Sequence, residues 1–114
     1  MGNVPYEELP FLYSACMIFV YPSTCESFGM TLVEAMACGA PILASMAEPM
    51  KEICADAALY FDPMNQTAMA DVIFKALSDN ELINALRKNA LERAKAFSWE
   101  NTASQTLKIF ENIA

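Results

Sequence analysis

Histidine is absent from this chain, and its four cysteines stand far apart. Cys16, Cys25, Cys38 and Cys54 form no C-x-x-C pair, and no histidine is available to complete a zinc site. We therefore expect no metal ion and no cofactor. The four thiols are expected to be small, mostly buried apolar groups in a protein of the reducing cytosol.

Basic residues are scarce. The chain has 7 Lys and Arg against 14 Asp and Glu, which gives a net charge of -7. Nucleic-acid binding requires clusters of Lys and Arg that neutralise phosphates, so this class of partner is excluded. Docking to an anionic membrane surface is disfavoured for the same reason.

Long apolar runs are also missing. The longest, residues 11–21, is too short to cross a bilayer and contains Ser14. Glu7, Glu8 and two prolines among the first ten residues do not fit a signal peptide. We expect a cytoplasmic protein with no membrane segment.

What the sequence does contain is enough apolar residues, 55% of 114, for the core of one domain. Continuous apolar runs closed by Pro, Ser or Asp predict buried strands, and apolar residues at helical spacing predict helices. The expected strands are 17–21, 41–44 and 58–61. The expected helices are 5–15, 30–38, 48–54, 65–77, 79–96 and 99–113, with Gly39 as the stop signal of the second. This alternation predicts an α/β fold: about three parallel strands flanked by helices, a partial Rossmann-like domain spanning residues 1–114.

Two glutamates flank the start of the second expected helix. Glu26 lies in the loop after the first strand, and Glu34 lies one turn into the helix. Gly29 lets a ligand approach the backbone, and the amides of Met30, Thr31 and Leu32 are expected to point out of the helix start toward an anion. A carboxylate at position 34 can accept hydrogen bonds from a diol such as ribose. The arrangement suits a sugar nucleotide.

The spacing alone leaves a second interpretation open. Glu34 can be a solvated helix residue, and Glu26 a loop acid near a helix N-terminus.

The surrounding residues resemble a known family. The matching runs are Tyr21-Pro22-Ser23, Glu26-Ser27-Phe28-Gly29, Leu32 to Ile42, Glu52-Ile53, Ala57-Ala58-Leu59 and Phe97-Ser98-Trp99. Together they resemble the retaining glycosyltransferases of the GT-B fold, which have two Rossmann-like domains. They resemble especially the large family that contains sucrose and glycogen synthases and many bacterial lipopolysaccharide and capsule glycosyltransferases. The likeness covers nearly the whole chain.

The resemblance implies specific roles. Glu26 would contact hydroxyls of the donor sugar and is the residue assigned to catalysis, by positioning the donor. Phe28 and Gly29 would offer amides to the same sugar, Thr31 and Leu32 would offer amides to the distal phosphate, and Glu34 would bind the ribose diol. The implied donor site comprises Glu26, Ser27, Phe28, Gly29, Met30, Thr31, Leu32 and Glu34. Ser23 and Thr24 would line the pocket or serve only as loop and turn residues.

The resemblance also implies missing parts. In that family an Arg and a Lys upstream of this region neutralise the diphosphate, and an N-terminal domain completes the acceptor site. We therefore expect a fragment of a larger enzyme that transfers no sugar alone and whose partners are a nucleotide sugar and that N-terminal domain.

Two further expectations concern surfaces of the chain. The first strand should have an unpaired edge that permits a homodimer. The last helix, with Trp99, Leu107, Phe110 and Ile113, is expected to cover apolar surface that includes the other domain; the alternative is that it packs only on its own domain.

Other functions stay open at this point. One is a non-catalytic half-Rossmann interaction module, which the lack of the Arg and Lys pair favours. Another is a GT-B-like sugar-nucleotide epimerase or phosphorylase, although a phosphorylase needs a cofactor lysine that has no clear counterpart here.

Overall fold

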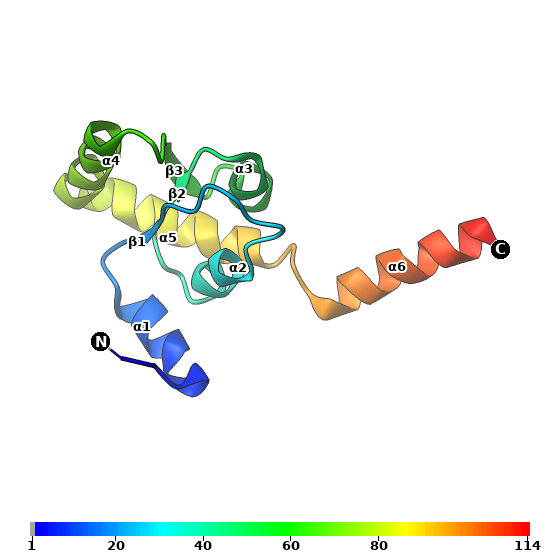
Figure 1. Ribbon diagram of the computed structural model, residues 1–114. Coiled ribbons are helices and arrows are strands. Elements are labelled where there is room, and N and C mark those ends of the chain that lie inside the picture. The colour runs from blue at the N-terminus through cyan, green and yellow to red at the C-terminus, as the bar shows by residue number, and fades with distance from the viewer. Residues whose placement is uncertain (1) are drawn as a thin grey trace.

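A three-stranded parallel sheet forms the centre of the fold, with the strands in the order β1-β2-β3 (Figure 1). The computed structural model describes residues 2–114. The strands are β1 (Phe19–Tyr21), β2 (Ile42–Ser45) and β3 (Ala58–Phe61). The helices are η1 (Tyr6–Glu8, a 3-10 turn), α1 (Leu9–Ala15), α2 (Met30–Ala37), α3 (Glu48–Cys54), α4 (Gln66–Ser78), α5 (Asn80–Ala94) and α6 (Trp99–Ile113). The predicted α/β class and its three parallel strands are confirmed.

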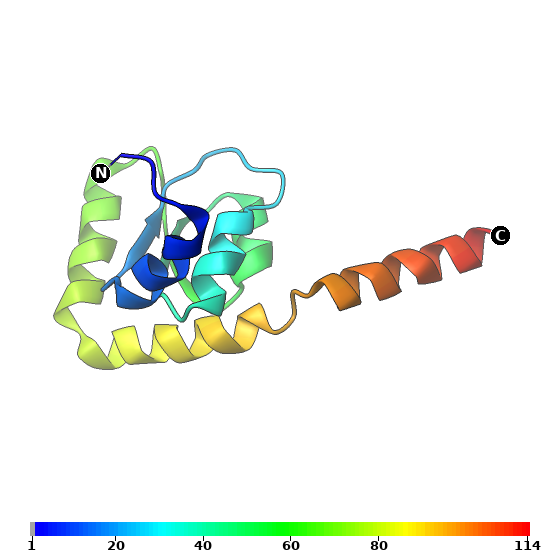
Figure 2. The same ribbon diagram turned by 90° about the horizontal axis from the view of Figure 1, so that it is seen from below.

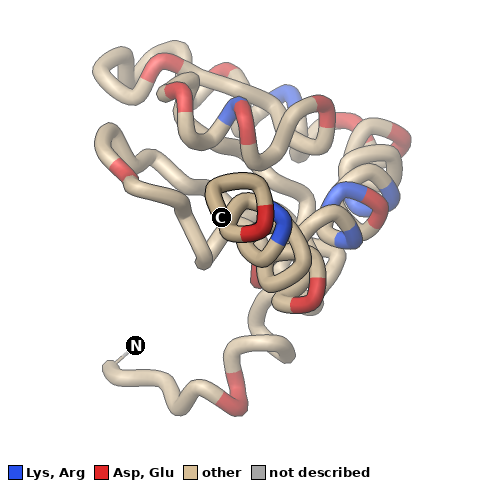
Figure 3. The backbone as a smooth tube through the Cα atoms, turned by 90° about the vertical axis from the view of Figure 1, so that its right-hand side faces the viewer, with Lys and Arg blue, Asp and Glu red and all other residues tan. Residues whose placement is uncertain are grey.

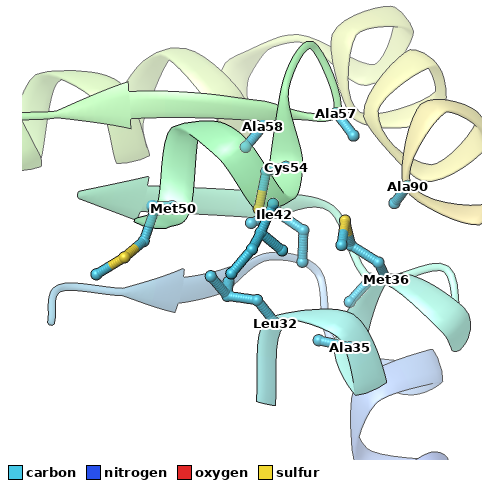
Figure 4. Packing of buried hydrophobic residues seen from close by; sticks show 12 residues of the cluster. Leu32, Ala35, Met36, Ile42, Met50, Cys54, Ala57, Ala58 and Ala90 are labelled. Carbon is cyan, nitrogen blue, oxygen red and sulfur yellow. The ribbon is translucent and has the colours of Figure 1, made fainter. Parts of the chain in front are cut away.

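The central strand β2 is buried on both faces of the sheet, as expected for a continuous apolar run. Ile42 and Ala44 point to the face covered by α2 and α3, whose packing is shown in Figure 4. Leu43 points to the opposite face, where it packs with Phe61 beneath α4 and α5. The two faces give two separate apolar clusters around one thin sheet.

Helix α2 is bounded by two glycines in the left-handed region, Gly29 at φ 85° and Gly39 at φ 72°. At the C-terminal end the amides of Gly39 and Ala40 donate to the carbonyls of Met36 and Ala35, at 2.9 and 3.0 Å. This is the Schellman arrangement, so the stop signal predicted at Gly39 is confirmed. The two glycines fix where α2 starts and stops relative to the sheet.

Strand β1 is shorter than predicted, because it begins at Phe19 and not at Met17. Met17 is 69% exposed, and the chain before the strand is held by Arg87 of α5. The Arg87 guanidinium donates to the carbonyl oxygens of Cys16 at 2.7 Å and Gly39 at 3.0 Å. One arginine thus connects the entry to β1 with the end of α2.

Replacing Arg87 by methionine should lower the free energy of unfolding by about 1.5–3 kcal/mol, since two charge-assisted hydrogen bonds are lost while the aliphatic stem is kept. Urea denaturation followed by circular dichroism measures the change. Lys88→Met, an exposed neighbour on α5, is the matched control and should change stability by less than about 0.5 kcal/mol. Equal effects of the two variants would contradict the role assigned to Arg87.

Helix α6 projects from the body of the domain (Figures 1 and 2). It extends the molecule to 53 × 31 × 30 Å, and none of its residues is buried. Ser98 caps its start by accepting from the Asn101 amide at 3.0 Å, which confirms the predicted cap. Its exposed apolar residues share one side of the helix at helical spacing: Trp99, Leu107, Ile109, Phe110 and Ile113. The alternative that α6 packs only on its own domain is therefore wrong within the described residues.

Strand β1 lies at one edge of the sheet and, among residues 2–114, pairs only with β2. The unpaired edge predicted for the first strand is confirmed for this part of the chain. The homodimer that it permits stays a prediction.

Candidate functional site

The predicted site residues lie at the carboxyl edge of the parallel sheet. The loop of residues 22–29 leaves the end of β1 and leads directly into the start of α2, as Figure 2 shows. Ligands of open parallel sheets bind at this edge. The fold therefore brings both glutamates and the helix start to the edge where binding is expected.

Glu26 is held by hydroxyl groups from its own loop and strand. Tyr21 donates from its phenol to Glu26 Oε1 at 2.5 Å, and Ser23 donates from Oγ to the same oxygen at 3.0 Å. These two hydrogen bonds, the tyrosine's first, hold the pKa of the Glu26 carboxyl below its usual value. Glu26 is therefore a fixed, ionised acceptor.

A buried serine supports this loop from the neighbouring strand. Ser45, the last residue of β2, is 0% exposed and donates from Oγ to the Ser23 carbonyl oxygen at 2.5 Å. The sequence predicts that this strand ends at Ala44 and predicts no role for Ser45, whereas β2 extends to Ser45. The sequence feature that could have revealed this role is a single hydroxyl residue at the end of an otherwise apolar buried strand, because a buried hydroxyl needs a hydrogen-bond partner.

The start of α2 offers two amides where three were predicted. The Leu32 amide donates to the Gly29 carbonyl at 3.0 Å, and the Leu32 side chain is fully buried. The left-handed Gly29 turns its carbonyl into the first helical turn, so this amide is used within the chain. The amides of Met30 and Thr31 have no acceptor among residues 2–114 and can bind an anion, where the helix dipole favours it.

Glu34 lies half-buried in the second turn of α2 and accepts a hydrogen bond from Tyr6. The Tyr6 phenol donates to Glu34 Oε1 at 3.1 Å, and the Tyr6 side chain is 71% exposed. This hydrogen bond to Glu34 is the main cause that raises the pKa of Tyr6. Each glutamate thus has one oxygen that accepts from a tyrosine, and among residues 2–114 only Glu26 has a second donor.

The side chains of the remaining predicted residues point to other surroundings. The Phe28 ring packs edge-on against the Phe97 ring, with the ring centroids 6.0 Å apart. The Arg93 guanidinium lies over the other ring, with its Cζ 5.1 Å from the Phe97 centroid. Phe28 and Met30 line an apolar groove of about 620 Å³ that reaches the first turns of α6. Ser27 is exposed. Among residues 2–114 the backbone amides of Phe28 and Gly29 have no acceptor, so they stay available for the predicted contact with the donor sugar.

Arginines near this segment serve the fold. Arg93 donates to the carbonyl oxygens of Ile53 at 2.8 Å and Glu52 at 2.7 Å, at the end of α3. In Figure 3 the Lys and Arg segments lie on helical turns.

Among residues 2–114, no group of three or more His, Cys, Asp or Glu side chains is placed to hold a metal ion. In the same part of the chain, no helix has the length and apolar character needed to span a bilayer.

The sequence and fold are similar to those of known glycosyltransferases. A family model described as glycosyl transferases group 1 matches residues 1–93. The O-antigen chain mannosyltransferase B of Escherichia coli is 40% identical over 111 residues, which are 97% of this chain and 29% of that protein. The D-inositol 3-phosphate glycosyltransferase of Corynebacterium urealyticum is 33% identical over 111 residues, 96% of this chain and 26% of that protein.

One solved structure shares the fold over nearly the whole chain. The sucrose-phosphate synthase of Thermosynechococcus elongatus superposes with a TM-score of 0.88 at 34% identity, covering 99% of this chain and 29% of that one. The chain therefore spans less than a third of the length of these relatives.

Proposed function

Since the chain belongs to the glycosyl transferases group 1 family, we propose that residues 1–114 form the part of a retaining glycosyltransferase that binds the nucleotide-sugar donor. The observation that carries the proposal is the helix start with free amides at Met30 and Thr31, flanked by the carboxylates of Glu26 and Glu34. It provides anion-binding donors between two groups that accept hydrogen bonds from hydroxyls. A nucleotide sugar presents these features in the same order: sugar, diphosphate, ribose.

The proposed roles follow from the geometry. The amides of Met30 and Thr31 bind the diphosphate and stabilise its charge as it leaves the sugar. Glu34 accepts hydrogen bonds from the ribose diol, and Glu26 accepts from hydroxyls of the donor sugar. A general base works best with a pKa near the operating pH, and the pKa of Glu26 is held low. Glu26 therefore contributes by orienting the donor and not by removing a proton.

The sugar proposed is a hexose. Mannose is the first to test, because the E. coli relative that is 40% identical is named a mannosyltransferase. The acceptor is proposed to be a glycan or a lipid-linked sugar.

The remaining parts of the enzyme are proposed partners. We propose that an N-terminal domain supplies the acceptor site and further diphosphate contacts, and that residues 1–114 alone transfer no sugar. The apolar side of α6 supports a contact with that domain, and the open edge of β1 supports pairing of two copies. All four thiols are free, which supports a cytoplasmic location.

Glu34→Ala should weaken nucleoside diphosphate binding about ten-fold or more, because the variant loses charge-assisted hydrogen bonds to the ribose. Chemical shifts of backbone amides, followed during titration with GDP or UDP to millimolar concentration, measure the affinity. Shifts at Met30 and Thr31 place the diphosphate.

Glu111→Ala on the exposed α6 is the matched control and should bind as the unaltered chain does. Binding that Glu34→Ala leaves unchanged would contradict the role of Glu34. No shift at millimolar nucleotide would favour the non-catalytic interaction module.

A further inference from the structure

We propose that Tyr21 and Ser23 are positioning residues that occupy Glu26 Oε1 and so present Oε2 as the acceptor for a donor-sugar hydroxyl. The inference rests on the proposed donor-sugar role of Glu26. Tyr21 and Ser23 thereby gain a positioning role, in addition to the roles of the glutamates and amides of the donor site.

Both hydrogen bonds end on the same carboxylate oxygen. Tyr21 Oη lies 2.5 Å and Ser23 Oγ lies 3.0 Å from Glu26 Oε1, and no donor among residues 2–114 bonds to Oε2. A carboxylate accepts through about four lone-pair positions, so two donors on Oε1 leave mainly Oε2 for a ligand. Two fixed donors also define the plane in which the carboxylate lies.

Tyr21 is a rigid source of its hydrogen bond. It ends β1, and its ring stacks on Phe19 with centroids 6.1 Å apart and planes at 21°. Phe19 meets Tyr13 of α1 edge-on, at 5.5 Å and 86°. The three rings connect Glu26 to the packed body of the domain.

The phenol keeps its proton at ordinary pH. Burial, followed by the hydrogen bond to Glu26, raises the pKa of Tyr21 to about 12. It is therefore always a donor, and Glu26 Oε1 is always the acceptor once the carboxyl has ionised.

Ser23 is fixed from a second strand. Its carbonyl oxygen accepts from the buried Ser45 at the end of β2, so its backbone cannot shift without breaking that bond. The ends of β1 and β2 thus both determine where Glu26 lies. Glu34 differs, because within the described part of the chain its one donor is the exposed Tyr6 of the short η1 turn. Glu26 is pre-positioned, whereas Glu34 is free to adjust to its ligand.

The test compares Tyr21→Phe and Ser23→Ala with the unaltered chain. Each removes one hydroxyl; the phenylalanine keeps the ring stack. Tyr60→Phe is the matched control, since it removes a tyrosine hydroxyl that bonds to the Ala55 carbonyl and not to Glu26. Glu26→Gln assigns the Glu26 carboxyl signal by its loss from spectra of chains labelled with ¹³C-glutamate.

Two readouts are needed. The first is the pKa of the Glu26 carboxyl, which should rise toward its ordinary range in Tyr21→Phe and Ser23→Ala and stay unchanged in Tyr60→Phe. The second is affinity for GDP-mannose against GDP and for UDP-glucose against UDP, measured by amide shifts. Loss of one supporting hydrogen bond should weaken sugar-nucleotide binding about five-fold, with nucleoside diphosphate binding unchanged. A merely structural role would weaken both ligands alike.

The outcomes separate this inference from the function it rests on. If Glu26→Gln reduces sugar-nucleotide affinity but Tyr21→Phe and Ser23→Ala change neither the pKa nor the affinity, the positioning role is wrong and the donor site stands. If Glu26→Gln has no effect on sugar-nucleotide affinity, or the unaltered chain binds no sugar nucleotide, the donor-sugar role of Glu26 fails and the inference falls with it.

Discussion

Replacing Phe61 by alanine is expected to lower the free energy of unfolding by about 3–5 kcal/mol. Phe61 ends β3, is 1% exposed, and packs with Leu43, Ala76 and Leu86 between the sheet and helices α4 and α5. The variant loses the burial of the ring and leaves a cavity that the close-packed neighbours only partly fill. Small domains are stable by about 5–15 kcal/mol, so this loss removes much of the margin.

Phe74→Ala is the matched control, because it makes the same chemical change on the outer side of α4, where the ring is 74% exposed. It should alter stability by less than about 0.5 kcal/mol. Urea denaturation of both variants, with similar m-values, gives the comparison. A Phe61 variant no less stable than the Phe74 variant would show that the second apolar cluster is not part of a cooperative core.

The second large effect is expected at Gly29. Gly29→Val should lower the free energy of unfolding by about 2 kcal/mol and weaken nucleoside diphosphate binding by about ten-fold or more. At φ 85° a β-branched residue is strained, and a Cβ there would lie 3.4 Å from Ile53 Cδ1 and 3.5 Å from Leu32 Cδ1. The strain is relieved by moving the start of α2, which displaces the amides of Met30 and Thr31.

Gly39→Val separates strain from function. Gly39 has φ 72°, and a Cβ there would lie 3.4 Å from Leu91 Cγ, so the stability cost should be similar. Because Gly39 lies at the opposite end of α2, the variant should keep its nucleotide affinity. Equal affinities of the two variants in the amide-shift titration would show that the start of α2 does not bind the diphosphate.

The fold was largely predictable because its strands are short apolar runs closed by strong local signals. Pro22 follows the first strand, Gly39 ends the helix before the second, and Asp62 follows the third. A buried parallel strand can be recognised from its continuous apolar run alone, without knowing which strand it pairs with. The first strand was overextended by two residues, since the apolar Met17 and Ile18 carry no signal that pairing begins only at Phe19.

The site was predictable only in part. The sequence motif predicts which residue types lie in the site, and the order of loop, glycine and helix predicts the free amides at the start of α2. It does not reveal that Tyr6 reaches Glu34 across 28 positions, or that the Leu32 amide turns back to Gly29. It also does not reveal that Tyr21 and Ser23 share one carboxylate oxygen. These features depend on how the folded segments meet.

Helix α6 has a consequence for the order of this part of the chain. A 15-residue helix with no buried side chain is marginal in water, even with a cap such as Ser98. Its helical population therefore depends on what covers the side that bears Trp99, Leu107 and Phe110. A surface that binds this side would therefore also have to order these residues. Its affinity would be reduced by the entropy of that ordering, and its release would return the segment toward the coil.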